Sequence, residues 1–147
     1  MTSPSETATD TFSRSFNCSQ AVFSTFAAQL GLDEATALKL ASPFGAGFAR
    51  RGEVCGAVTG ALLVLGLARG AETPAGKDRI YRLSQEFMRQ FQEAHGSILC
   101  RELIGCDVST PEGYQAAADK RVFVTICPAL VSQAAEIVAG LLESARS

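Results

Sequence analysis

Apolar residues recur at helical spacing along residues 80–98, and this periodicity constrains the fold more than any other feature of the chain. They are spaced 3, 4, 4, 3 and 4 residues apart, at Ile80, Leu83, Phe87, Phe91, Ala94 and Ile98. This spacing places them on one face of an α-helix. Apart from the ambiguous stretch 121–126, no alternating β-rich run of useful length occurs. We therefore expect an all-α fold, a compact bundle of five to six helices.

Capping signals set the limits of the other expected helices. Asn17 followed by Gln20 is close to a capping box, Asp33 is an N-cap residue, and Pro43 disfavours helical conformation in the residue before it. These signals predict helices over about 18–30, 34–41, 53–70, 75–95 and 128–144. A break near 96–97 would start a short segment over 100–105, and another short helix is expected over 114–119.

Length and charge bound the class of protein. The 147 residues are enough for one ordinary domain, so we expect a single helical domain over 1–147. The formal net charge of -2 argues against a nucleic-acid surface. Residues 1–10 are polar and predict a flexible tail without the features of a signal peptide, which favours a cytoplasmic location. The apolar run Val54 to Ala68 is shorter than the roughly 20 residues of a membrane span, so we expect no spanning helix.

Cysteines are unusually frequent, with five in the chain. An odd number argues against a fully paired secreted framework and favours metal or redox chemistry. Four of them fall at or near the start of an expected helix, where free N–H groups and the helix dipole favour the thiolate: Cys18, Cys55, Cys100 and Cys127. If these helix starts converge, the four sulfurs form one site, suited to disulfide exchange or to binding a metal or cluster.

Cys55 is followed by several small residues within the expected helix. Gly56 and Gly60 would let a helix or a cofactor approach the backbone closely beside this thiol. The glycine-rich loop before it would cradle an anion, with Arg50 or Arg51 supplying charge. The alternatives are ordinary helix packing and an ordinary turn. We take Gly56, Gly60 and Arg51 as the candidate cofactor-binding residues.

Two other reactive residues lie outside this pattern. Cys106 follows Gly105 in an expected loop and is the odd cysteine, with a resolving thiol as its alternative role. His95 is the only histidine, and its place near a helix end favours solvation or a contact with the helix dipole over base catalysis. The sequence has no Cys-x-x-Cys motif of the thioredoxin type and no paired zinc knuckles.

The four helix-start cysteines each stand in a distinctive local sequence. These are Asn17-Cys-Ser-Gln-Ala-Val22, Cys55-Gly-Ala-Val-Thr-Gly60, Gly96-Ser-Ile-Leu-Cys-Arg-Glu-Leu103 and Cys127-Pro-Ala-Leu-Val131. In their order and context the chain resembles the C_GCAxxG_C_C family of redox-active proteins, over nearly its whole length. The resemblance implies a small helical protein that performs redox chemistry, and it brings no established substrate.

Three functions follow from these observations. The first is reversible thiol–disulfide chemistry, with Cys55 as the attacking thiol and a redox partner protein. The second is a metal or iron–sulfur module ligated by Cys18, Cys55, Cys100 and Cys127. The third is a helical interaction domain with inert cysteines. The cofactor therefore stays open between none, an iron–sulfur cluster and another thiolate-bound metal, and the small-residue helix face predicts a homodimer.

Overall fold

The computed structural model describes residues 2–144, and every regular element in this range is a helix. Eight α-helices have five or more residues: α1 (Pro4–Ser13), α2 (Cys18–Ala27), α3 (Glu34–Ala41), α5 (Gly56–Arg69), α6 (Lys77–His95), α7 (Cys100–Ile104), α8 (Pro111–Asp119) and α10 (Cys127–Ser144). Shorter segments connect them: α4 (Gly45–Phe48), α9 (Val122–Thr125), and the 3₁₀ helices η1 (Ala28–Leu30), η2 (Ser42–Phe44) and η3 (Pro74–Gly76). The all-α prediction is confirmed, but the expected number of five to six helices is wrong.

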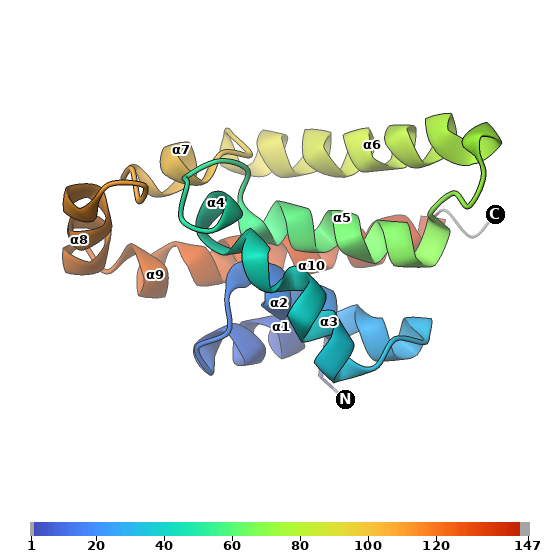
Figure 1. Ribbon diagram of the computed structural model, residues 1–147, viewed down its shortest axis with the longest axis horizontal. Coiled ribbons are helices and arrows are strands. Elements are labelled where there is room, and N and C mark those ends of the chain that lie inside the picture. Colours follow the sequence, from blue (N-terminus) through green and yellow to red (C-terminus); the bar gives the residue numbers. More distant parts are fainter. Residues whose placement is uncertain (1, 145–147) are drawn as a thin grey trace.

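The N-terminal segment accounts for one of the additional helices. Ser3 caps α1 by accepting a hydrogen bond from the backbone N–H of Glu6 at 3.2 Å, and Pro4 occupies the first helical position. Ala8 and Thr11 are buried, and α1 packs against α2 and α10 (Figure 1). The prediction of a flexible tail over 1–10 is therefore wrong for residues 4–10, because small side chains on one face of α1 let it dock.

Several predicted helix limits are confirmed. Asn17 and Gln20 form a reciprocal capping box at the start of α2, with N···O distances of 2.9 and 3.0 Å. Gly96 adopts a φ of 87° after α6 and so separates this helix from α7. Helix α5 starts at Gly56, later than expected, which places Cys55 at the N-cap instead of in the first turn. The ambiguous stretch 121–126 contains the short helix α9.

The core forms where α2, α5 and α10 meet. Helices α2 and α5 pack closely, α10 contacts both of them together with α1, and α6 covers α5 and α10 (Figure 1). Gly60 makes the close approach of α5 to α2 possible, because a Cβ atom there would lie 2.7 Å from the Ser19 carbonyl oxygen. Helices α7, α8 and α9 lie at one end of the long helices, near the turn formed by α4 (Figure 1).

One helical run is long and apolar enough to cross a membrane by length and composition alone, and it covers Val122–Ser144. Seven residues of α10 are buried: Leu130, Val131, Ala134, Ala135, Ile137, Val138 and Leu141. They belong to the same apolar core as buried residues of α1, α2 and α5. A single such run is weak evidence for a membrane span, since the core helix of a globular domain passes the same test.

Candidate functional site

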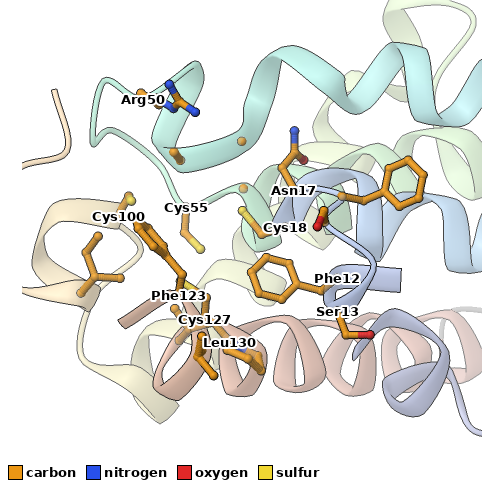
Figure 2. Close-up of a pocket in the computed structure, with 18 of the residues that line it drawn as sticks. Phe12, Ser13, Asn17, Cys18, Arg50, Cys55, Cys100, Phe123, Cys127 and Leu130 are labelled. Carbon is orange, nitrogen blue, oxygen red and sulfur yellow. The ribbon is translucent and has the colours of Figure 1, made fainter. Parts of the chain in front are cut away.

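A cavity of about 820 Å³ opens at the end of the bundle where several helices begin. Cys18, Cys55, Cys100 and Cys127 all line it, and they come from the starts of α2, α5, α7 and α10 (Figure 2). The helix starts therefore converge, as the sequence pattern requires for a shared site. Cys106 does not line this cavity and is buried beside Val108 and Ala117. All five cysteines are free thiols in this structure.

The missing side chain at Gly56 brings two of the sulfurs together. A Cβ atom at this position would collide with the Cys18 sulfur and would lie 2.9 Å from the Phe44 carbonyl oxygen. Glycine therefore allows the start of α2 to sit directly against the start of α5. Cys55 directly precedes Gly56, and its thiol is close enough to the Cys18 sulfur to change the pKa of Cys18.

A short antiparallel bridge fixes Cys100 relative to Cys55. Val54 pairs with Leu99. The Cys55 N–H donates to the Ile98 carbonyl at 2.8 Å, and the Cys100 N–H donates to the Glu53 carbonyl at 2.6 Å. Both cysteines thus leave the same pair of backbone segments to begin neighbouring helices, α5 and α7. The pairing holds these two helix starts side by side without a covalent link.

The turn around α4 has an uncommon backbone that also contacts the cysteines. Five consecutive residues, 46–50, have φ values between 53° and 68°, which is a left-handed helical turn. Four of them are not glycine, and such residues cost roughly 1–2 kcal/mol each in this conformation. Gly47 is the exception, and a Cβ atom there would lie 2.8 Å from the Cys100 Cβ. A strained turn packed against the cysteines indicates that its geometry serves the site.

Cys18 is the thiol whose ionised form is favoured. The hydrogen bond from Cys55 lowers the pKa of Cys18 from 9.0 to about 7, against the opposing effect of burial. Backbone N–H groups of Ala46, Ser19 and Cys18 itself also lower this pKa. The pKa of Cys55 is raised well above 9.0, because its proton is held in the bond to Cys18 and because the group is buried. These directions favour Cys18, instead of the expected Cys55, as the thiolate of the pair.

The other two lining cysteines are kept as thiols. Burial raises the pKa of Cys100 to about 11, and the nearby Cys18 adds to this effect. Burial also raises the pKa of Cys127 to about 12, with further contributions from Cys18 and Cys100. His95 is not a lining residue, so it is not placed to act as a base at these sulfurs. Its ring packs on Phe91 with a centroid distance of 4.7 Å, and desolvation lowers its pKa.

The donor geometry does not form a ready metal site. Within residues 2–144, no group of three or more His, Cys, Asp or Glu side chains is arranged to hold a metal ion. The four cysteines that line the cavity match the number and type of ligands of an iron–sulfur cluster. Such a cluster needs all four thiolates around one point. Three of these thiols, Cys55, Cys100 and Cys127, have raised pKa values, which opposes the deprotonation that a metal requires.

The three candidate cofactor-binding residues have different positions. Gly56 lines the cavity, whereas Gly60 lies against α2 and permits helix packing. Arg51 lies outside the cavity lining, and its neighbour Arg50 is part of it. Gly60 and Arg51 are therefore not part of the cavity wall, and their expected role in binding a cofactor stays a prediction.

Sequence patterns did not indicate the aromatic part of the wall. Phe12, Phe16, Tyr114 and Phe123 line the cavity, and they come from α1, the loop after it, α8 and α9. Tyr114 also packs against Phe123 with a centroid distance of 5.5 Å. None of these residues stands in a motif, so no local signal marks them as part of the site. Phe12 is a large apolar residue in a polar segment. Once this segment is known to be a helix, Phe12 is expected to face inward.

One family model matches most of the chain. Residues 16–141 match the model described as "Putative redox-active protein (C_GCAxxG_C_C)". The chain belongs to this family. Its cysteine–glycine order in the central motif is Cys55-Gly56-Ala57, whereas the family's name has glycine before cysteine. No curated protein and no solved structure matches the chain.

Proposed function

We propose that this chain is a thiol–disulfide redox protein in which Cys18 and Cys55 form a reversible disulfide. The observation that carries the proposal is the juxtaposition of the two thiols: the Cys18 sulfur packs against Gly56, the residue after Cys55, and the interaction with Cys55 lowers the pKa of Cys18. This arrangement brings together the two sulfurs that must bond, and it stabilises the thiolate that must attack. The membership of a family described as redox-active supports the same class of chemistry.

The reaction would proceed by two thiol–disulfide exchanges. The Cys18 thiolate attacks one sulfur of a substrate disulfide, whose S–S bond breaks and releases the first substrate thiolate. Cys55 then gives up its proton and attacks the Cys18 sulfur of the mixed disulfide, which releases the second substrate thiolate. Two electrons pass from the protein to the substrate, and the Cys18–Cys55 disulfide remains. A dithiol reductant would return the protein to its reduced form by the reverse steps.

The alternatives are a metal or iron–sulfur module and a domain with inert cysteines. The shared cavity favours the first of these, but the absence of a three-ligand group in residues 2–144 opposes it. A domain with inert cysteines gives no reason for a thiol with a lowered pKa, whereas the pKa of Cys18 is lowered from 9.0 to about 7. The proposal also places the protein in the cytoplasm, where thiols are kept reduced. The redox partner protein and the homodimer stay predictions.

Trapping of the mixed disulfide tests the proposal. Cys55→Ser should react with a small disulfide and accumulate a stable mixed disulfide at Cys18, detectable by mass spectrometry and peptide mapping. Cys18→Ser should form neither the mixed nor the internal disulfide. Cys106→Ser is the matched control, because this buried thiol is outside the cavity, and it should oxidise like the unaltered protein. Reversible oxidation in Cys18→Ser would contradict the assignment.

Two measurements on the unaltered protein guard against misfolded variants. At pH 7, limited alkylation should label Cys18 about fivefold faster than an ordinary thiol, because its greater thiolate fraction outweighs its lower intrinsic nucleophilicity. Protein purified without oxygen should contain no stoichiometric iron, other metal or inorganic sulfide. Near-stoichiometric metal would instead support ligation by the four cavity cysteines and would overturn the dithiol proposal.

A further inference from the structure

The cavity that holds the cysteines has one charged residue in its wall among residues 2–144, and this residue is Arg50. No aspartate or glutamate lines it. The remaining wall combines aromatic rings with small polar groups such as Asn17 and Ser42. A pocket with this composition favours a ligand that carries negative charge at one point and is otherwise uncharged.

Arg50 is positioned at the wall by two features of the fold. Its backbone is the last residue of the left-handed turn, with a φ of 67°. Its guanidinium lies over the Tyr114 ring, 4.8 Å from the ring centroid. No carboxylate among residues 2–144 forms an ion pair with it. The stacked guanidinium therefore keeps its N–H donors free for an anion, which it can bind in a bidentate manner.

The charge of Arg50 is not used to activate the attacking sulfur. The groups that lower the pKa of Cys18 are Cys55 and three backbone N–H groups. Figure 2 shows Arg50 set apart from the sulfur atoms of Cys18 and Cys55. The cation is thus available for a part of the substrate remote from the reacting disulfide. Binding energy from such a remote group orients the reacting atoms.

The size of the cavity and the burial of its thiols limit the kind of substrate. A volume of about 820 Å³ is in the range of pockets for small molecules. Cys55 is 5% exposed, Cys100 is 7% exposed, and the attacking Cys18 is half-buried. A disulfide within a folded protein would have to bring its backbone into this space, whereas a small disulfide can enter alone.

We propose, on the basis of the dithiol function above, that the substrate is a low-molecular-weight disulfide bearing a carboxylate or another anionic group, which Arg50 binds while Cys18 attacks the disulfide. The anion remains unchanged in the reaction. The substrate S–S bond breaks, its two sulfurs leave as thiolates that take up protons, and two electrons come from Cys18 and Cys55. Arg50 is in this scheme a specificity-determining residue.

A series of small symmetric disulfides that differ in charge tests this proposal. Dithiodipropionate is anionic, hydroxyethyl disulfide is neutral and cystamine is cationic. The rate of oxidation of the reduced protein should be about tenfold higher with the anionic compound than with the neutral one, which corresponds to one charge-assisted contact. Cystamine should be the slowest, and added salt should reduce the differences. Each rate is first divided by the rate of the same disulfide with a free small thiol.

Two neighbouring arginines provide a matched pair of variants. Arg50→Gln should abolish the preference for the anionic compound over the neutral one. Arg51→Gln removes the same charge from a residue outside the cavity wall and should keep the preference. Arg50→Lys should restore it in part, since the charge returns without the planar fork. Circular dichroism checks that the variants fold.

The outcomes separate this inference from the function on which it rests. Equal corrected rates for the three compounds, or an equal loss in both arginine variants, would overturn the role of Arg50 while the dithiol function stands. A protein disulfide that oxidises Cys18 faster than every small compound would overturn the small-molecule substrate. If no disulfide oxidises the Cys18–Cys55 pair, the proposed function itself fails.

Discussion

Cys18 and Cys127 occupy the same position in their helices and have opposite acidities. Each is the first residue of a helix, Cys18 in α2 and Cys127 in α10. The pKa of Cys18 is lowered to about 7, whereas the pKa of Cys127 is raised to about 12. A helix start alone therefore does not make a reactive thiol. The difference shows that specific donors to the sulfur decide the outcome.

The donors explain the contrast in physical terms. Hydrogen bonding from the Cys55 thiol and from backbone N–H groups, which include Ala46 of the left-handed turn, lowers the pKa of Cys18. Cys127 has burial as the main influence on its pKa, with two nearby cysteines adding to it. A helix dipole contributes about 0.3–1 kcal/mol, which is less than the cost of burying a thiolate without donors.

The largest expected effect comes from separating the two sulfurs. Gly56→Ala places a methyl group against the Cys18 sulfur and close to the Phe44 carbonyl oxygen. We expect a loss of about 2–3 kcal/mol in the free energy of unfolding, measured by urea denaturation, because neither neighbour can move freely. The variant should also lose fast alkylation at Cys18 at pH 7, so that Cys18 resembles Cys127.

Gly66→Ala is the control on the same helix. A Cβ atom at Gly66 would meet nothing within 4 Å. This variant should be unchanged or more stable by up to about 1 kcal/mol, because alanine favours the helix over glycine. Similar stability in Gly56→Ala and Gly66→Ala would mean that contact with Cys18 does not require glycine.

The pH dependence of the free energy of unfolding should report the lowered pKa of Cys18 and the raised pKa of Cys127 separately. The pKa of Cys18 falls from 9.0 to about 7 on folding, so the unfolded chain binds more protons between pH 7 and 9, and stability rises with pH there. This contribution is lost as the pH falls through 7. The pKa of Cys127 rises to about 12, so its contribution is present below pH 9 and is lost as the pH increases toward 12.

Variants isolate these two contributions. In thermal or urea unfolding followed across pH, Cys18→Ser should lose a rise of about 1–2 kcal/mol between pH 7 and 9. Cys127→Ser should keep that rise and show a smaller fall above pH 9. Parallel profiles for Cys18→Ser and the unaltered protein would show that the Cys18 thiolate is not stabilised by folding.

The smallest expected effect concerns the residue next to Cys18. The Ser19 hydroxyl is buried and has no hydrogen-bond partner among residues 2–144, while the Ser19 backbone N–H donates to the Cys18 sulfur. Ser19→Ala keeps that N–H and removes the unpaired hydroxyl. We expect stability to change by less than about 1 kcal/mol, in the stabilising direction, with an unaltered alkylation rate at Cys18. A slower rate would assign the hydroxyl a part in holding the thiolate.

Local signals predicted much of the helical framework. The capping box at Asn17 and Gln20 and the helix end at Gly96 need only neighbouring residues, and both are present in the structure. The helix at residues 4–13 was not predicted, because its polar composition hides the small residues that dock it. The aromatic wall was not predicted either, since Phe12 and Phe123 line one cavity only after distant segments fold together.

The sequence by itself determined that the chain is helical and that four cysteines stand at helix starts, because capping and periodicity act over a few residues. The tertiary structure decided which of them is favoured as the thiolate, because the groups that lower the pKa of Cys18 include Cys55 at the N-cap of α5 and Ala46 in the left-handed turn. It also decided that Arg50, and not Arg51, lines the cavity. Hydrogen bonding and burial depend on where distant segments meet, and no local pattern in the chain carries that information.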